Sequence, residues 1–211
     1  MRSMMLCATA LAVSMTLTAA AHAQTVLRLG HVGEVGSHFD VAGNEFAKRV
    51  KEKSGGKIEV QVFPSSQLGN DKDMLQKMKL GQIDFFLPSS IMSSVTPEFG
   101  VFDMPYIIKD REHAARVMAK MGDGVFRPAA EAKGVKILGF WENGFRQITN
   151  NVRPIVKPDD LKGVKLRTPR GEWRVKMFQS YGANPSPMAF SEVFTALKTG
   201  VMDGQENPLI N

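Results

Sequence analysis

The sequence is poor in the residues that carry covalent and metal chemistry. Its single cysteine, Cys7, lies in the first 23 residues, which the sequence predicts to be removed, so the mature chain lacks a thiol for a disulfide, a nucleophile or a metal site. The three histidines after residue 23 are too dispersed for a recognisable ligand set. No nucleophile elbow, zinc-protease pair or phosphate-binding loop is present. Missing motifs alone do not exclude an enzyme, but together with the features described below they lead us to predict a protein that is not an enzyme and needs no cofactor.

Clustered positive charge and long internal apolar runs are also missing. The 27 Lys and Arg residues exceed the 21 acids and give a net charge of +6, but the lysines are interleaved with acidic residues. No basic block with interleaved aromatic residues occurs, which argues against nucleic acid as a partner. After the amino terminus no apolar run is long enough to predict a membrane span.

The amino terminus has the pattern of an export signal. Arg2 precedes an apolar run over residues 4–20, and Ala21-His22-Ala23 fits the small-x-small cleavage pattern. An uncleaved membrane anchor is the competing interpretation, but hydroxyl residues at positions 14, 16 and 18 interrupt the run. We therefore predict a signal peptide over residues 1–23, cleavage after Ala23 and a periplasmic mature protein.

The first half of the mature chain alternates strand and helix patterns. Ser37 is a suitable N-cap for an amphipathic helix, and Gly81 is a suitable helix stop. Period-two alternation of apolar residues predicts the strands. The expected order is strand 25–32, helix 38–53, strand 57–63, a short helix ending at Gly81, and strand 82–87.

The remainder is less regular at first and then repeats the opening order. Helical spacing predicts helices at 110–121 and 125–133, and a nearly continuous apolar run predicts a strand buried on both faces at 134–141. The second half is then expected to form strand 163–168, helix 171–181, an extended segment 182–188, helix 191–199 and strand 201–203.

The two halves share a Lys-x-Gly-x-apolar-Asp junction, which ends at Asp84 in one half and at Asp203 in the other. Two β-α-β-α-β units demand parallel strands and therefore open α/β sheets. We predict a two-lobed, periplasmic-binding-protein-like α/β fold, with lobe one at residues 24–143 and a partial lobe two at residues 144–211.

Three residues of the second half are candidates for a binding site. Arg146, Arg167 and Asn207 each lie at the edge of a predicted strand, and ligands of open α/β sheets bind beyond the carboxyl ends of the strands. Two guanidinium groups and an amide suit a bound carboxylate. The alternative is that both arginines are strand-end residues paired with Asp or Glu. His38, at the start of a helix, either contacts ligand or merely begins that helix.

Several segments resemble the solute-binding proteins of tripartite ATP-independent periplasmic (TRAP) transporters, of the C4-dicarboxylate-binding, DctP-like type. They span nearly the whole mature chain, and the second and third in this order are highly specific. They are GFRQITNNVRPI (144–155), DLKGVKLRTP (160–169), ANPSPMAFSEVFTALKTGVMDGQENP (183–208) and FPSSQLGNDKDMLQKMKLGQIDF (63–85).

The resemblance implies capture of a small organic acid between two lobes and its delivery to TRAP membrane permease subunits. It implies that Arg167 forms a salt bridge with the ligand carboxylate, assisted by Arg146 and Asn207. Phe190 falls where the family places a ligand-facing ring. Ser89 and His38 fall where lobe one contacts the distal part of the ligand.

The family's chains are considerably longer, so the resemblance implies that this chain is truncated at its carboxyl end. Other interpretations remain open at this stage. They are the binding component of another uptake system, the exported input domain of a sensor, a periplasmic enzyme with an acidic residue in the cleft, and a non-functional truncated product.

Overall fold

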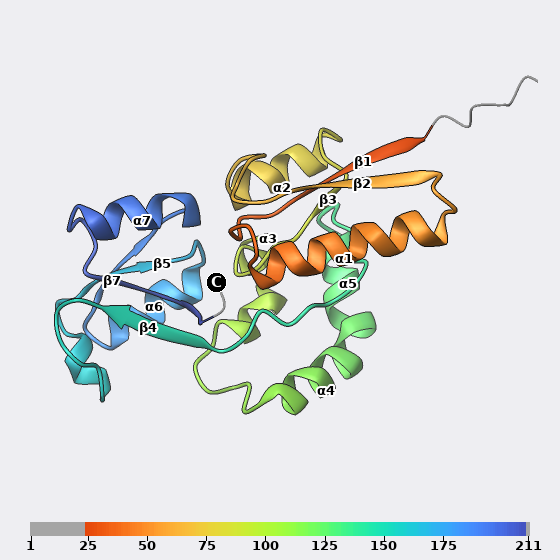
Figure 1. Ribbon diagram of the computed structural model, residues 1–211. Coiled ribbons are helices and arrows are strands. Elements are labelled where there is room, and N and C mark those ends of the chain that lie inside the picture. The colour runs from red at the N-terminus through yellow and green to blue at the C-terminus, as the bar shows by residue number, and fades with distance from the viewer. Residues whose placement is uncertain (1–23, 210–211) are drawn as a thin grey trace, which may run out of the picture.

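Two separate sheets organise the computed structural model, which describes residues 24–209 (Figure 1). The predicted signal peptide and its cleavage site lie outside these residues. Within them, no helix is both long enough and apolar enough to cross a membrane. The predicted two-lobed α/β architecture is confirmed: each sheet carries its own helices, and the two groups of elements lie side by side.

The first sheet has the order β2-β1-β3, with all strands parallel. It comprises β1 (Thr25–Gly30), β2 (Ile58–Phe63) and the two-residue β3 (Phe85–Phe86), connected through α1 (His38–Lys53) and α2 (Asp71–Lys79). The crossover through α1 leads from the central strand β1 to the edge strand β2. The crossover through α2 then leads from β2, past β1, to the opposite edge strand β3. Right-handed crossovers of this kind put the two helices on opposite faces of the sheet, as Figure 1 shows.

Side-chain caps fix where both helices begin. The Ser37 hydroxyl accepts a hydrogen bond from the Asp40 amide at the start of α1. Asn70 and Asp73 form a reciprocal capping box at the start of α2. Met74, which is fully buried, anchors α2 in a core cluster with Val32, Ile83, Phe86 and Ile91.

The second sheet repeats this topology around β5 and adds one antiparallel strand. Its order is β4-β7-β5-β6, in which β5 pairs in parallel with β6 and β7, whereas β4 is antiparallel to β7. The helices α6 and α7 follow β5 and β6. The bounds are β4 (Arg146–Asn150), β5 (Lys165–Thr168), α6 (Glu172–Ser180), β6 (Asn184–Pro187), α7 (Phe190–Lys198) and β7 (Gly204–Pro208).

The repeated Lys-x-Gly-x-apolar-Asp junction has the same structural role in both lobes. Gly81 and Gly200 have φ of +69° and +74°, a left-handed conformation that ends α2 and α7 at little cost only for glycine. The aspartate three residues later accepts from a backbone amide of the central strand. Asp84 accepts from Arg28 at 2.7 Å, and Asp203 accepts from Lys165 at 2.9 Å.

Short helices that follow β3 along the chain complete the first lobe. Asp110 caps the longest of them by accepting from the His113 amide. Phe99, Phe126 and Ala130 form a second core cluster there. The helical segments are α3 (Met92–Val95), the 3-10 helix η1 (Pro97–Phe102), α4 (Arg111–Met121), the π-helical η2 (Gly122–Phe126) and α5 (Arg127–Glu131); another 3-10 helix, η3 (Pro158–Leu161), precedes β5.

The strand predicted at residues 134–141 is wrong. The segment has no strand partner among the described residues, and the carbonyl oxygens of Ile137 and Leu138 instead accept hydrogen bonds from the Arg127 guanidinium. Leu138 is 60% exposed, so the apolar run is not covered on both faces. Apolar character indicated burial, but a strand also needs a neighbour that supplies ladder hydrogen bonds.

The strand predicted at residues 201–203 is also misplaced, because β7 begins at Gly204. Residues 201–203 form the turn that brings Asp203 to β5. The strands predicted at 25–32 and 82–87 are shorter than expected, since β1 ends at Gly30 and β3 spans only Phe85–Phe86. The predicted helices at 38–53 and 110–121 are confirmed, with the second beginning one residue later.

Replacing Gly204 with alanine is expected to destabilise the second sheet. A Cβ at this position would lie 2.3 Å from the Thr149 carbonyl oxygen and 2.7 Å from the Asn150 Cβ, so β4 and β7 would have to separate. We expect the free energy of unfolding of the full-length protein to fall by roughly 1–3 kcal/mol, the usual cost of overpacking.

Urea unfolding measures this loss. Gly124→Ala is the matched control, because a Cβ at Gly124 meets no atom within 4 Å. An unfolding midpoint for Gly204→Ala equal to that of the wild type would contradict the β4–β7 packing.

Candidate functional site

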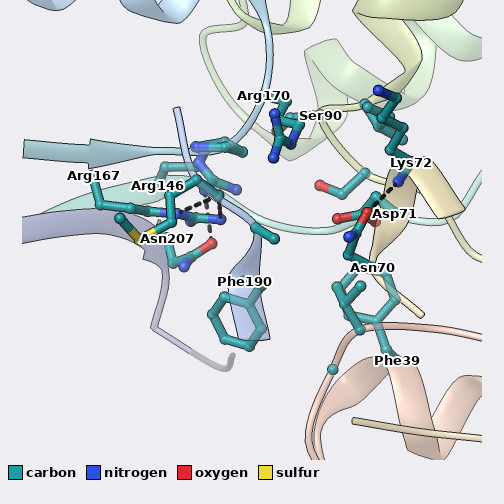
Figure 2. A pocket seen from close by; sticks show the side chains of 17 residues that line it. Phe39, Asn70, Asp71, Lys72, Ser90, Arg146, Arg167, Arg170, Phe190 and Asn207 are labelled. Atoms are coloured by element: carbon teal, nitrogen blue, oxygen red, sulfur yellow. Dashed lines mark hydrogen bonds between the residues drawn. The ribbon is translucent and has the colours of Figure 1, made fainter. Parts of the chain in front are cut away.

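A cleft between the two lobes contains most of the predicted site residues. Its empty volume, including space open to solvent, is about 570 Å³. Figure 2 shows Arg146, Arg167, Asn207 and Phe190 on one side and Asp71 across from them. The first lobe contributes Val32, Gly33, Phe39, Asn70, Asp71, Lys72, Ser89, Ser90 and Ile91; the second contributes Arg146, Arg167, Pro169, Arg170, Met188, Ala189, Phe190 and Asn207.

Sheet topology brings the three predicted second-lobe residues to one edge. Arg167 lies near the carboxyl end of β5, opposite Gln205 of the parallel strand β7, and Asn207 lies two residues further along β7. Because β4 is antiparallel, its first residue, Arg146, lies at this same edge, opposite Pro208. The strand pairing therefore places all three residues at one edge of the sheet, as expected from the sequence.

Arg167 is buried to 2% exposure, yet its guanidinium is only partly used. Nε and Nη2 both donate to the Met188 carbonyl oxygen, at 3.0 and 2.8 Å, and Nη1 has no hydrogen-bond partner among the described residues. The Phe190 ring lies 5.8 Å from the Arg167 Cζ. Burial lowers the Arg167 pKa to about 10, so the group is charged at neutral pH.

Arg146 is held by two residues of β7. Its Nε and Nη2 donate to the Glu206 carboxylate, and Nη2 also donates to the Asn207 Oδ1 at 2.7 Å. Burial lowers the Arg146 pKa, although the Glu206 carboxylate opposes that shift. The amide Nδ2 of Asn207 donates to Gln205 Oε1. Arg146 is therefore ion-paired within the lobe and also lines the cleft.

Arg174 of α6 extends the charged group to the other lobe. It donates a hydrogen bond to Glu206 at 3.2 Å and forms an ion pair, at 2.8 Å, with Asp103, just after η1 in the first lobe. Nearby, Gly100 of η1 packs so closely on Trp173 that a Cβ would lie 2.6 Å from the indole nitrogen. We name Arg146, Arg167, Arg174, Glu206 and Asp103 the guanidinium cluster.

The guanidinium cluster has an excess of one positive charge. Two of its three guanidinium groups form ion pairs with its two carboxylates, Glu206 and Asp103, which are 2% and 4% exposed. An uncompensated charge in a weakly polar interior is costly, and a bound anion offsets that cost. Nη1 of Arg167 offers donors in the planar arrangement that a carboxylate accepts.

Asp71, the first residue of α2, is an acidic side chain on the opposite side of the cleft. Its Oδ1 is buried without a hydrogen-bond partner among the described residues. Burial raises its pKa to about 6, against a smaller lowering by the Arg167 charge. Asp71 is thus a carboxyl group that faces the guanidinium groups across open space.

The two predicted first-lobe residues have different positions. Ser89 lines the cleft, whereas His38 is not among the lining residues. The His38 Nε2 lies 2.9 Å from the Asn143 Oδ1, and the Asn143 Nδ2 donates to the Ser89 Oγ at 2.7 Å. His38 therefore contacts residues that line the cleft, Ser89 through Asn143 and Phe39 through its ring, without lining the cleft itself. Direct ligand contact by His38 stays a prediction.

Several residues of the site were not singled out from the sequence. Glu206 and Asp71 lie inside the segments DGQENP and QLGNDKD, which carry the family resemblance. An acidic residue in each of these segments is the feature by which the sequence could have identified them. Arg174 and Asp103 carry no local signal, because their pairing joins segments of different lobes. Among the described residues, no group of three or more His, Cys, Asp or Glu is placed to hold a metal ion.

The sequence profile of the bacterial extracellular solute-binding proteins, family 7 (DctP), matches residues 29–211. The chain belongs to this family. The 2,3-diketo-L-gulonate-binding periplasmic protein YiaO of Escherichia coli is 35% identical over 185 residues, which are 87% of this chain and 56% of that protein. The chain thus spans less than two thirds of the length of this DctP relative.

Solved structures of TRAP periplasmic solute-binding proteins have the same fold. A TRAP periplasmic solute-binding protein of Polaromonas sp. JS666, bound to D-erythronate, is 36% identical with a TM-score of 0.85, and the match covers 89% of this chain and 62% of that one. A second, from Sulfurospirillum deleyianum with bound succinate, is 37% identical with a TM-score of 0.86, covering 90% and 61%. The relatives are binding proteins for organic acids.

The raised pKa of Asp71 predicts a pH-dependent stability. Its folded-state pKa is about 6, above the ordinary 3.8, so the folded protein binds the proton more tightly than the unfolded chain. Stability should rise as the pH falls through 6 toward 3.8. Between pH 7 and pH 4.5 we expect the wild type to gain roughly 1–3 kcal/mol relative to Asp71→Asn.

Urea unfolding of the full-length protein at the two pH values measures this difference. Asp159→Asn, which removes an exposed carboxylate, should keep the wild-type pH dependence. If Asp71→Asn also keeps it, Asp71 does not have the raised pKa.

Proposed function

We propose that this chain is part of an extracytoplasmic solute-binding protein of a TRAP-type transporter, which captures a small organic acid by its carboxylate and delivers it to the membrane permease. Arg167 is the principal carboxylate ligand, and Arg146 and Asn207 complete that end of the site. Phe190 provides an apolar wall. The proposed role is binding and delivery, with no catalytic step.

The observation that carries this proposal is the buried guanidinium of Arg167, which faces the cleft with Nη1 unused. A surface ion pair, the alternative considered from the sequence, would leave the side chain exposed and paired with an acid. Arg167 is instead buried and bonded to a neutral carbonyl, inside a guanidinium cluster with one excess positive charge. A ligand carboxylate supplies the missing negative charge.

The two lobes are proposed to grip the ligand from both sides. We assign residues 24–143 to lobe one and residues 144–211 to lobe two, with the hinge at residues 142–144. Lobe closure shifts the population toward the form in which both lobes contact the ligand. Export to the periplasm, with cleavage after Ala23, and recognition of the closed form by the permease belong to the same proposal.

Arg167→Ala in the full-length protein is expected to weaken binding of the organic-acid ligand by roughly 2–5 kcal/mol, because the ligand carboxylate would lose its buried partner. Isothermal titration calorimetry measures this change. The matched control is Arg49→Ala, which removes an exposed arginine of α1 that is paired with Glu45, and it should bind like the wild type. Equal affinity of Arg167→Ala and wild type would refute the role assigned to Arg167.

A further inference from the structure

Three side chains form a polar chain that ends in the cleft. Asn143 presents its Oδ1 to the His38 Nε2 and its Nδ2 to the Ser89 Oγ, at 2.9 and 2.7 Å. Because an amide oxygen only accepts, the proton in the first bond must reside on the His38 Nε2. Each hydrogen bond is therefore donated in the same direction, from His38 to Asn143 and from Asn143 to Ser89.

This direction makes Ser89 a donor toward the cleft. Its Oγ already accepts from Asn143, and no described residue accepts its hydroxyl hydrogen. Ser89 lines the cleft, on the first-lobe side. A ligand oxygen near Ser89 therefore meets a hydrogen-bond donor.

Asp71, on the same first-lobe side of the cleft, is a hydrogen-bond acceptor, whereas Ser89 is a donor. Its Oδ1 is buried and unpartnered, and an ionised carboxylate only accepts. Figure 2 shows the Asp71 carboxyl group directed toward the space between the lobes. Burial raises the pKa of this carboxyl group to about 6, so Asp71 is ionised at pH 7.5. A ligand group near Asp71 therefore has to donate.

One common group both accepts from a serine and donates to a carboxylate, and that group is an alcohol. On the basis of the proposed function, we infer that the ligand is a hydroxylated monocarboxylic acid, with its carboxylate on Arg167 and its hydroxyl groups at Ser89 and Asp71. A dicarboxylate would place its second carboxylate against Asp71, and two close like charges in a buried site repel strongly.

Other charged groups at the cleft do not reverse the preference for a hydroxylated monocarboxylate over a dicarboxylate. Lys72 and Arg170 also line the cleft and would attract a second carboxylate, but both are exposed, so water and salt screen them. Arg146 is paired with Glu206 and lies on the second-lobe side. Asp71, whose Oδ1 is buried, is thus the charge that the distal part of the ligand meets.

Calorimetry at pH 7.5 on the full-length protein tests this inference with two matched sets of acids. The four-carbon set is erythronate, succinate and butyrate, and the six-carbon set is gluconate, adipate and hexanoate. We expect the hydroxylated monocarboxylate of at least one set to bind about tenfold or more tightly than its two counterparts, as expected for a hydrogen bond to a charged group.

Variants assign the effect to the two side chains. Asp71→Asn should weaken binding of the hydroxylated acid and strengthen binding of the dicarboxylate, whereas Asp159→Asn should change neither. Ser89→Ala should weaken the hydroxylated acid about tenfold. Asn143→Asp should resemble Ser89→Ala, because an aspartate accepts the serine hydrogen and reverses the last bond of the chain. The control for this substitution is Asn151→Asp on the exposed surface.

Two outcomes overturn the inference, and they are distinguishable from failure of the proposed function. The first is a dicarboxylate or an unsubstituted acid that binds at least as well as the hydroxylated acid while Arg167 is still required. The second is preferred binding of the hydroxylated acid that neither Asp71→Asn nor Ser89→Ala alters. If none of the six acids binds, or if binding ignores Arg167→Ala, the proposed function fails and the inference fails with it.

Discussion

The burial of three guanidinium groups beside two carboxylates is the constraint on which the second lobe depends. Arg146, Arg167 and Arg174 converge on Glu206 from three different elements, β4, β5 and α6. Burying this much charge is unfavourable unless it is paired, and the pairing here is one negative charge short. In the proposed function, an anion that occupies the cleft supplies the missing negative charge, so the same electrostatic deficit would contribute to affinity.

The sequence predicted much of the fold because the relevant signals are local. Ser37, Gly81 and Gly200 set helix ends through caps and left-handed backbone, and alternating apolar residues identified β1 and β2. The duplicated junction at Asp84 and Asp203 indicated a repeated unit, and the two sheets have the same parallel core. From the parallel order it also followed that Arg167 and Asn207 lie at one edge of the sheet.

What the sequence could not supply are pairings between distant segments. The apolar run at residues 134–141 satisfied the local criterion for a strand, but strand formation depends on a neighbouring edge that composition does not specify. The bond between Arg174 and Asp103 likewise joins two lobes. The role of Asn143 depends on the approach of α1 and the loop after β3, and no periodicity encodes that approach.

The contact between Arg174 and Asp103 also restricts how the lobes can move. Arg174 bonds carboxylates of both lobes, and Trp173 beside it packs tightly on Gly100, so this region joins the two halves independently of the covalent connection. A rotation that parts Asp71 from Arg167 about the proposed hinge at residues 142–144, while preserving this ion pair, has an axis that passes near both the hinge and Arg174.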